Sequence, residues 1–165
     1  MALEILYLVR HGKAESSHPK GDRHRVLSAE GRTRIADLVP KVQGLGWRVD
    51  AALSSSYQRA LQTRDLFVPF DPSVALGQSS AFSPLAEARE ALDELESWVA
   101  RGSTRIAVFT HNPLLTQLSE ALLAPGSVPG PVIGELVFHT PTVLALAFPE
   151  GFGAHRATPL WILHP

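Results

Sequence analysis

Ile5-Leu6-Tyr7-Leu8-Val9-Arg10-His11-Gly12 is the stretch of this sequence that decides the fold. Residues 5–9 form a continuous apolar run of strand length, which is typical of a strand buried on both faces. Strands of that kind occur in parallel sheets that helices cover on both sides. The run stops abruptly at Arg10, so polar side chains stand where the strand ends.

The same pattern of buried strand followed by helix continues to the middle of the chain. Residues 13–25 are polar and predict a loop, after which Ser28 is a candidate N-cap for a helix to about Val42 that Pro40 kinks or ends. Residues 51–54 predict a second buried strand. Ser55 and Ser56 are candidate caps for a helix over 57–67, and capping is the expected role of Ser55.

A third helix and a third strand follow a loop that prolines interrupt. Ser83 and Pro84 stand in the order typical of an N-cap and a first helical residue. Spacings of three and four predict one apolar helix face, and Gly102 is the expected stop. The residues of that face are Leu85, Ala88, Leu92, Leu95 and Val99. Residues 105–109 then predict another buried strand.

The last third of the chain carries weaker signals. Residues 114–123 predict a helix and 125–131 a loop, while 135–139 and 143–148 are typical of a hairpin and 160–163 of a final strand. The alternation predicts an α/β three-layer sandwich, with a mainly parallel central sheet and helices on both faces. We expect residues 1–165 to form a single domain.

The composition excludes several classes of protein. The 165 residues are 45% hydrophobic and 19% charged, which is typical of a globular domain. The net charge of −1 argues against a nucleic-acid or anionic membrane surface. With no cysteine, the chain has neither a Cys nucleophile nor a Cys-ligated metal. We expect a cytoplasmic protein, because neither a signal peptide nor a membrane-length apolar run is present.

Charged and imidazole side chains follow the predicted strands directly. Arg10 and His11 end the first strand, and His111 follows the strand at 105–109. In α/β sheets ligands bind at the carboxyl ends of the strands, so we expect the two histidines to face each other. Arg59, in the first turn of a helix, and Arg25, at the end of the polar loop, can reach the same edge.

This set of side chains favours phosphoryl chemistry over two alternatives. Arginines beside the histidines disfavour a metal ion, because guanidinium groups are permanently cationic. A serine hydrolase is disfavoured because the Gly-x-Ser-x-Gly motif is absent. Arginines can hold phosphoryl oxygens, and a neutral imidazole can attack phosphorus to form a phosphohistidine intermediate. The surrounding cations lower the pKa of His11 and so keep it nucleophilic.

Four segments of the sequence carry a resemblance to a known family. Together they resemble motifs of the histidine phosphatase superfamily, which has the phosphoglycerate mutase-like fold, and one of them is typical of its short, SixA-like branch of phosphohistidine phosphatases. The segments are Leu8-Val9-Arg10-His11-Gly12, Asp22-Arg23-His24-Arg25-Val26-Leu27-Ser28-Ala29-Glu30-Gly31, Ser55-Ser56-Tyr57-Gln58-Arg59-Ala60-Leu61-Gln62-Thr63 and Thr110-His111-Asn112-Pro113.

The resemblance implies a role for each candidate residue. His11 is implied as the phosphorylated nucleophile, and Gly12 lets the backbone pass close to it and offers a carbonyl to its ring. Arg10, Arg59 and His111 are implied to bind phosphate, with Arg25 as the additional arginine of the short branch. No metal or cofactor is expected.

The sequence departs from the family pattern at the proton donor. Residues 80–84 contain no carboxylate where many members have one, and Glu87, expected one helical turn further on, is the nearest candidate. A missing acid favours phosphohistidine on a protein, because its leaving imidazole is easily protonated. The interval from Arg59 to His111 also leaves no room for a long lid. The alternatives are a small-molecule phosphomonoesterase that uses Glu87, and a non-catalytic domain that binds phosphorylated ligands.

Overall fold

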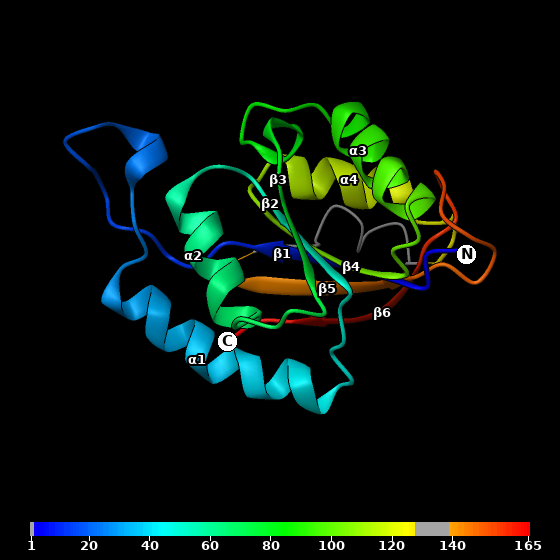
Figure 1. Cartoon of the computed structure of the whole chain (residues 1–165), viewed down its shortest axis with the longest axis horizontal. Helices are drawn as coiled ribbons and strands as arrows, with labels where there is room; N and C mark the ends of the chain where they lie inside the picture. Colours follow the sequence, from blue (N-terminus) through cyan, green and yellow to red (C-terminus); the bar gives the residue numbers. More distant parts are fainter. Residues whose placement is uncertain (1, 128–138) are drawn as a thin grey trace.

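A single six-stranded sheet organises the chain in the computed structural model, which describes residues 2–127 and 139–165 (Figure 1). The strand order is β3-β2-β4-β1-β5-β6. The parallel pairs are β1 with β4, β4 with β2 and β2 with β3, whereas β5 runs antiparallel to both β1 and β6. The strand bounds are β1 Ile5–Arg10, β2 Ala51–Ser54, β3 Ala75–Gln78, β4 Arg105–Thr110, β5 Thr142–Ala147 and β6 Thr158–Leu163.

Helices cover both faces of this sheet, which confirms the predicted three-layer α/β architecture (Figure 1). Alternate side chains of β1 enter opposite layers, with Leu6 and Leu8 in one core and Tyr7 and Val9 in the other. The first core packs against α3 (Ala88–Ala100) and α4 (Leu114–Leu122), and the second against α1 (Ala29–Gly44) and α2 (Gln58–Phe67). The uninterrupted apolar run of β1 is therefore explained by burial on both faces.

The structure confirms most of the predicted elements in the N-terminal half. Ser28 caps α1, and its hydroxyl accepts a hydrogen bond from Gly31 N. The helix continues through Pro40 to Gly44 rather than ending near Val42. Pro40 is exposed, so water can satisfy the carbonyl that loses its helical donor.

The predicted start of the third helix is wrong. Ser83 and Pro84 follow a short 3₁₀ turn at Ser80–Phe82, and α3 begins only at Ala88 with Glu87 as its N-cap. Leu85 therefore lies outside the helix and is 88% exposed, whereas Ala91 and Leu95 are buried. The strand β3 was not predicted. It lies at the edge of the sheet, where three of its four residues are exposed and only Gly77 is partly buried, so its sequence has no apolar pattern.

The end of the chain forms an antiparallel pair of strands. β5 begins and ends one residue before the predicted strand at 143–148, and β6 contains the predicted strand at 160–163. The rest of the predicted hairpin, 135–138, lies outside the described residues, as does 128–131 of the predicted loop. Among the helices that the structure describes, none has the length and apolar character needed to cross a membrane.

Candidate active site

The candidate site lies at the carboxyl ends of β1 and β4. These strands pair in parallel register, with Arg10 opposite Thr110, so the residue that follows each strand is a histidine. His11 N donates to Thr110 O at 3.1 Å, which ties the two strand ends together. The ring centroids of His11 and His111 lie 4.9 Å apart. The structure thus brings the two histidines together, as the strand pattern predicted.

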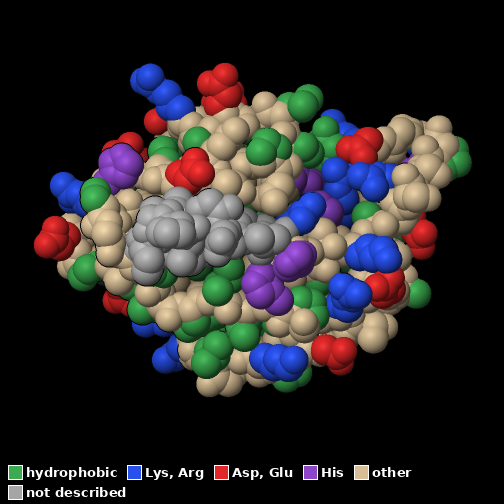
Figure 2. Space-filling model, turned by 180° about the vertical axis from the view of Figure 1, so that it is seen from behind, with side chains coloured by type: hydrophobic (Ala, Val, Ile, Leu, Met, Phe, Trp, Pro, Cys, Tyr) green, Lys and Arg blue, Asp and Glu red, His purple; other side chains and the backbone are tan. Residues whose placement is uncertain are grey.

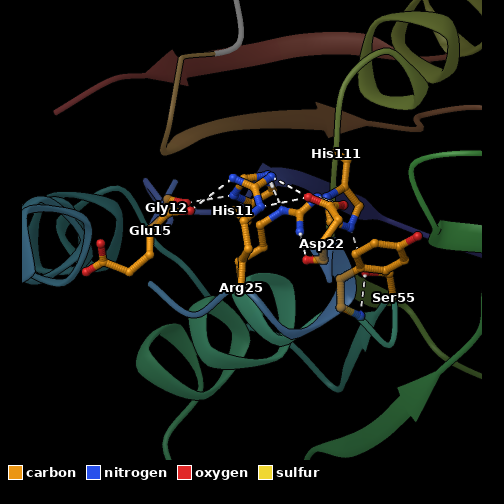
Figure 3. Close-up of polar contacts among 9 residues, drawn as sticks. His11, Gly12, Glu15, Asp22, Arg25, Ser55 and His111 are labelled. Atoms are coloured by element: carbon orange, nitrogen blue, oxygen red, sulfur yellow. Dashed lines mark hydrogen bonds and ion pairs between the residues drawn. The ribbon is translucent and has the colours of Figure 1, made fainter. Parts of the chain in front are cut away.

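The His11 ring is fixed in one orientation by its neighbour. Its Nδ1 lies 2.6 Å from the Gly12 carbonyl oxygen, so Nδ1 carries the proton and donates it (Figure 3). The other ring nitrogen, Nε2, keeps its lone pair and accepts a hydrogen bond from Arg59 Nε at 3.3 Å. A lone pair directed at a guanidinium is an arrangement suited to attack on an anionic group held by that guanidinium.

The backbone beside His11 is held by helix α2. Gly12 N donates to the Thr63 hydroxyl at 2.9 Å, and that hydroxyl donates to the Arg59 carbonyl at 2.7 Å. A Cβ on Gly12 would lie 2.6 Å from Cδ1 of the buried Ile35, so the Ile35 side chain of α1 would have to shift to admit it. Thr63 therefore links the end of β1 to α2, the helix that carries Arg59.

The environment keeps the His11 imidazole neutral. Its pKa is lowered to about 3, chiefly by burial, and the nearby guanidinium charges of Arg59, Arg10 and Arg25 lower it further against the opposing hydrogen bond to Gly12. The side chain is only 8% exposed. At neutral pH the nucleophilic form therefore needs no prior deprotonation.

His111 is held by a residue for which we predicted a different role. Its Nε2 lies 2.7 Å from the Ser55 hydroxyl, which also accepts from Tyr57 N at 3.4 Å (Figure 3). Ser55 thus orients the histidine, and the prediction that it caps the helix is wrong, because the N-cap of α2 is Tyr57. Burial, followed by the charges of the other site residues, lowers the pKa of His111 to about 2.

Arg25 and Arg59 meet at one carboxylate. Asp22 Oδ1 accepts from Arg25 Nε and lies 2.7 Å from Arg25 Nη2, while Asp22 Oδ2 accepts from Arg59 Nη2 at 3.1 Å. Arg59 Nη1 also donates to the Asp22 carbonyl at 3.0 Å, and Arg25 Nη1 donates to the Glu15 carbonyl at 3.1 Å. Burial lowers the pKa of Arg59, whereas the Asp22 carboxylate opposes that shift.

These side chains surround a small, positively charged pocket of about 300 Å³, which we call the His11 pocket. His11 and four of the five predicted phosphate-binding residues line it, whereas Gly12, the fifth, does not and instead holds the His11 ring through its carbonyl. Figure 2 shows Lys and Arg side chains gathered beside partly hidden His side chains on this face of the molecule. The lining residues are Arg10, His11, Lys13, Ala14, Arg25, Arg59, Pro84, His111, Asn112 and Thr140.

Within the part of the chain that the structure describes, no carboxylate lines the His11 pocket. Glu87, the predicted acid, is exposed at the N-cap of α3, and only Pro84 of that segment reaches the lining. The Glu15 side chain points away from His11 (Figure 3). Partial burial raises the pKa of Asp22, but its hydrogen bonds and charge contacts with Arg25 and Arg59 outweigh this and lower it. Asp22 is therefore ionised and a poor proton donor.

The described residues also contain no group of three or more His, Asp or Glu side chains that could hold a metal ion. The arrangement is instead suited to an anion, because cationic donors converge on one nucleophilic nitrogen. Sequence reasoning assigned no role to Asp22 or Thr63, and it assigned Ser55 a capping role only. All three lie in the segments that carry the family resemblance, and that was the one signal available for them.

Comparison with known proteins agrees with this geometry. Residues 6–74 match the family model of the histidine phosphatase superfamily, branch 1. An uncharacterised protein of Picosynechococcus sp. (strain ATCC 27264 / PCC 7002 / PR-6) is 27% identical over 118 residues, which cover 71% of this chain and 72% of that protein. The match to the family model covers His11, Arg25 and Arg59 and confirms the resemblance that the sequence motifs indicated.

Solved structures show the same fold over nearly the whole chain. The protein histidine phosphatase SixA in complex with tungstate superposes with a TM-score of 0.78 at 20% identity, covering 98% of this chain and 97% of that one. A structure from Agrobacterium tumefaciens, described as a candidate phosphohistidine phosphatase SixA, has a TM-score of 0.81 at 18% identity with full coverage of both chains. The predicted phosphoglycerate mutase-like fold is thus confirmed.

Proposed function

We propose that this chain, which carries the histidine phosphatase superfamily match over residues 6–74 and the fold of SixA, is a phosphatase that works through a phosphorylated His11. One observation carries the proposal. The His11 Nδ1 proton is fixed on the Gly12 carbonyl at 2.6 Å, while Nε2 faces the cationic His11 pocket with its lone pair. The reaction needs no metal or cofactor in this proposal, because the protein's own cations neutralise the phosphoryl charge.

The first step forms a bond between His11 Nε2 and phosphorus and breaks the bond from phosphorus to the leaving group. The substrate's phosphoryl oxygens take over the Arg59 Nε–H that Nε2 accepts in the free protein, which releases the lone pair for attack. Arg10, Arg25 and His111, which line the same pocket, hold the remaining oxygens. The leaving atom takes a proton from solvent.

The second step returns the enzyme to its starting state. Water attacks phosphorus, the bond from His11 Nε2 to phosphorus breaks, and inorganic phosphate leaves with the oxygen that water supplied. The proton released by water goes to solvent or phosphate, so His11 regains its neutral form. The lowered pKa of His11 makes its nitrogen a good leaving group in this step, since the free imidazole is stable without protonation.

The substrate that the pocket favours is phosphohistidine on a protein. An alkoxide leaving group needs a positioned acid, which contributes about 10²–10⁴-fold to rate. The His11 pocket has no carboxylate among its described lining residues. The imidazole that leaves from phosphohistidine depends less on a positioned acid than an alkoxide does, because it is easily protonated. A pocket of about 300 Å³ lies at the lower end of the range for small-molecule sites, which also suits a side chain presented on a protein surface.

The test compares initial rates on a phosphohistidine-bearing protein domain, a phosphoserine peptide and an aryl phosphate ester near neutral pH. We expect the phosphohistidine substrate to react about 10²-fold faster than the serine ester or more. A preference for the esters would instead support a small-molecule phosphomonoesterase, and Glu87→Gln would then be measured for loss of ester hydrolysis.

The His11→Ala variant separates an enzyme from a domain that only binds phosphorylated ligands. We expect it to bind inorganic phosphate, because the arginines remain, and to lose turnover. His24→Ala, which removes an exposed histidine of the neighbouring loop, is the matched control and keeps the wild-type rate. Turnover retained by His11→Ala would contradict the proposed mechanism, and absence of turnover in the wild type on every substrate would favour the binding domain.

A further inference from the structure

One exposed carboxylate holds two arginines of the His11 pocket at once. Asp22 contacts Arg25 through Oδ1 at 2.7 Å and Arg59 through Oδ2 at 3.1 Å, and its carbonyl accepts from Arg59 as well (Figure 3). In the Asp22–Arg59 ion pair, the Arg59 side chain is buried at 6% exposure, whereas the Asp22 side chain is 57% exposed. Asp22 itself does not line the His11 pocket.

The local backbone explains how Asp22 reaches both groups. Residues 22–24 form a 3₁₀ turn, and Arg25 N donates to the Asp22 carbonyl at 3.1 Å. Side chains three residues apart eclipse each other in such a turn, so Asp22 and Arg25 project together. Gly21 enters the turn with φ of 99°, a conformation that favours glycine. The turn then lies over α2, where Arg59 is the second helical residue.

Two guanidinium groups at one pocket repel each other, and this repulsion acts to lower the pKa of Arg59. Burial is the largest cause that lowers the pKa of Arg59, the charge of Arg25 lowers it further, and the Asp22 carboxylate acts in the opposite direction. Without an anion between them, the flexible Arg25 side chain is free to swing into solvent. The Arg25 side chain also donates one hydrogen bond to the Glu15 carbonyl.

We propose that Asp22 is a positioning residue, whose carboxylate holds Arg25 and Arg59 at the His11 pocket and thereby sets the affinity for a phosphoryl group. The proposal rests on the proposed function for the identity of the ligand. It concerns binding alone, so it can be tested whether or not the chain turns a substrate over.

The charge of Asp22 alone predicts the opposite effect on phosphate binding, so one measurement distinguishes the two explanations. Asp22 is an anion near a site for anions, so its removal by Coulomb's law alone would tighten phosphate binding. If Asp22 instead holds the arginines in place, its removal weakens binding, because each guanidinium must then be ordered by the ligand. The charge effect is screened by salt, whereas the loss of geometry is not.

The experiment measures binding of inorganic phosphate by calorimetry to the wild type, Asp22→Ala, Asp22→Asn and Asp22→Glu, at low and high ionic strength. We expect the Kd of Asp22→Ala to rise about ten-fold and this ratio to persist at high salt. Asp22→Asn keeps one acceptor and should fall between Ala and the wild type. Asp22→Glu keeps the charge and should lie nearer the wild type than Asn.

Asp65→Asn is the matched control. Asp65 is 64% exposed, pairs with Arg64 at 3.0 Å and does not line the His11 pocket, so its loss changes the net charge equally without freeing a pocket arginine. Its Kd should match the wild type at high salt. Melting temperatures and circular dichroism show whether each variant folds, and Asp22→Asn carries the test if Asp22→Ala does not.

Two results would overturn the proposal. Phosphate binding that is unchanged or tighter in both Asp22→Ala and Asp22→Asn would show that the carboxylate competes with the ligand or has no part in binding. An equal weakening in Asp65→Asn would show a general effect of charge. A wild type that binds phosphate but hydrolyses nothing would refute the proposed function and leave this proposal to stand or fall on the Kd values.

Discussion

The buried histidines give the folded protein a specific dependence on pH. The pKa of His11 is lowered to about 3 and that of His111 to about 2, against about 6.5 in an unfolded chain. As the pH falls below 6.5 the unfolded chain binds two protons that the folded chain does not. The stability contributed by the neutral rings is therefore complete above pH 6.5 and is lost as the pH falls towards the folded values.

The size of the effect follows from the same shifts. Each histidine contributes a slope of about 1.4 kcal/mol per pH unit once the unfolded state is fully protonated. Between pH 7 and pH 5.5 this amounts to a loss of about 1.2 kcal/mol for each ring, or about 2.5 kcal/mol for the pair. Both side chains are nearly fully buried, at 8% and 2% exposure, so little of this is screened by solvent.

The assay is urea unfolding of the wild type and of His11→Asn at pH 7 and pH 5.5, in buffer without phosphate because a bound anion would add stability. The wild type should lose about 1.2 kcal/mol more than His11→Asn over this interval. His24→Asn, which removes an exposed ring, is the control and should follow the wild type. Parallel pH dependences for wild type and His11→Asn would refute the claim that burial keeps His11 neutral.

Three further changes test other contacts of the site. Gly12→Ala places a Cβ 2.6 Å from Ile35 Cδ1 and should destabilise the protein by about 1–3 kcal/mol in urea unfolding. Activity should also fall, because the Gly12 carbonyl that holds the His11 ring shifts, and a variant of wild-type stability would contradict this packing. Ser55→Ala removes the hydrogen-bond partner of His111 Nε2 and should lower kcat about ten-fold while the melting temperature changes little. An unchanged kcat would show that Ser55 does not orient His111. Glu87→Gln should leave the rate on phosphohistidine unchanged, because the side chain is exposed outside the pocket, and a loss of rate would restore it as a candidate acid.

The strongly patterned elements of the fold could be predicted from the sequence, and the weakly patterned ones could not. β1 and β4 are buried on both faces, so their apolar runs are unmistakable. β3 is an exposed edge strand of four residues, and it is held as a strand by its hydrogen bonds to β2 rather than by a pattern in its own sequence. Pro84 was misleading because the order Ser-Pro fits a helix start, whereas here it follows a 3₁₀ turn.

The site divides in the same way. His11 and His111 could be predicted because each directly follows a buried strand, and parallel strand ends share one edge of a sheet. The roles of Asp22 and Ser55 depend on contacts across 37 and 56 residues of sequence, which local patterns do not encode. The exposed position of Glu87 could not be predicted either, because it follows from where α3 begins.

The central claim is that phosphate passes through His11, and a rapid-quench experiment with a labelled phosphohistidine protein tests it most directly. The quenched enzyme is digested at neutral to alkaline pH and the labelled peptide identified by mass spectrometry. We predict label on the peptide that contains His11 in the wild type, with neither label nor turnover in His11→Ala. Turnover by His11→Ala, or label on any other residue of an active wild type, would contradict the account.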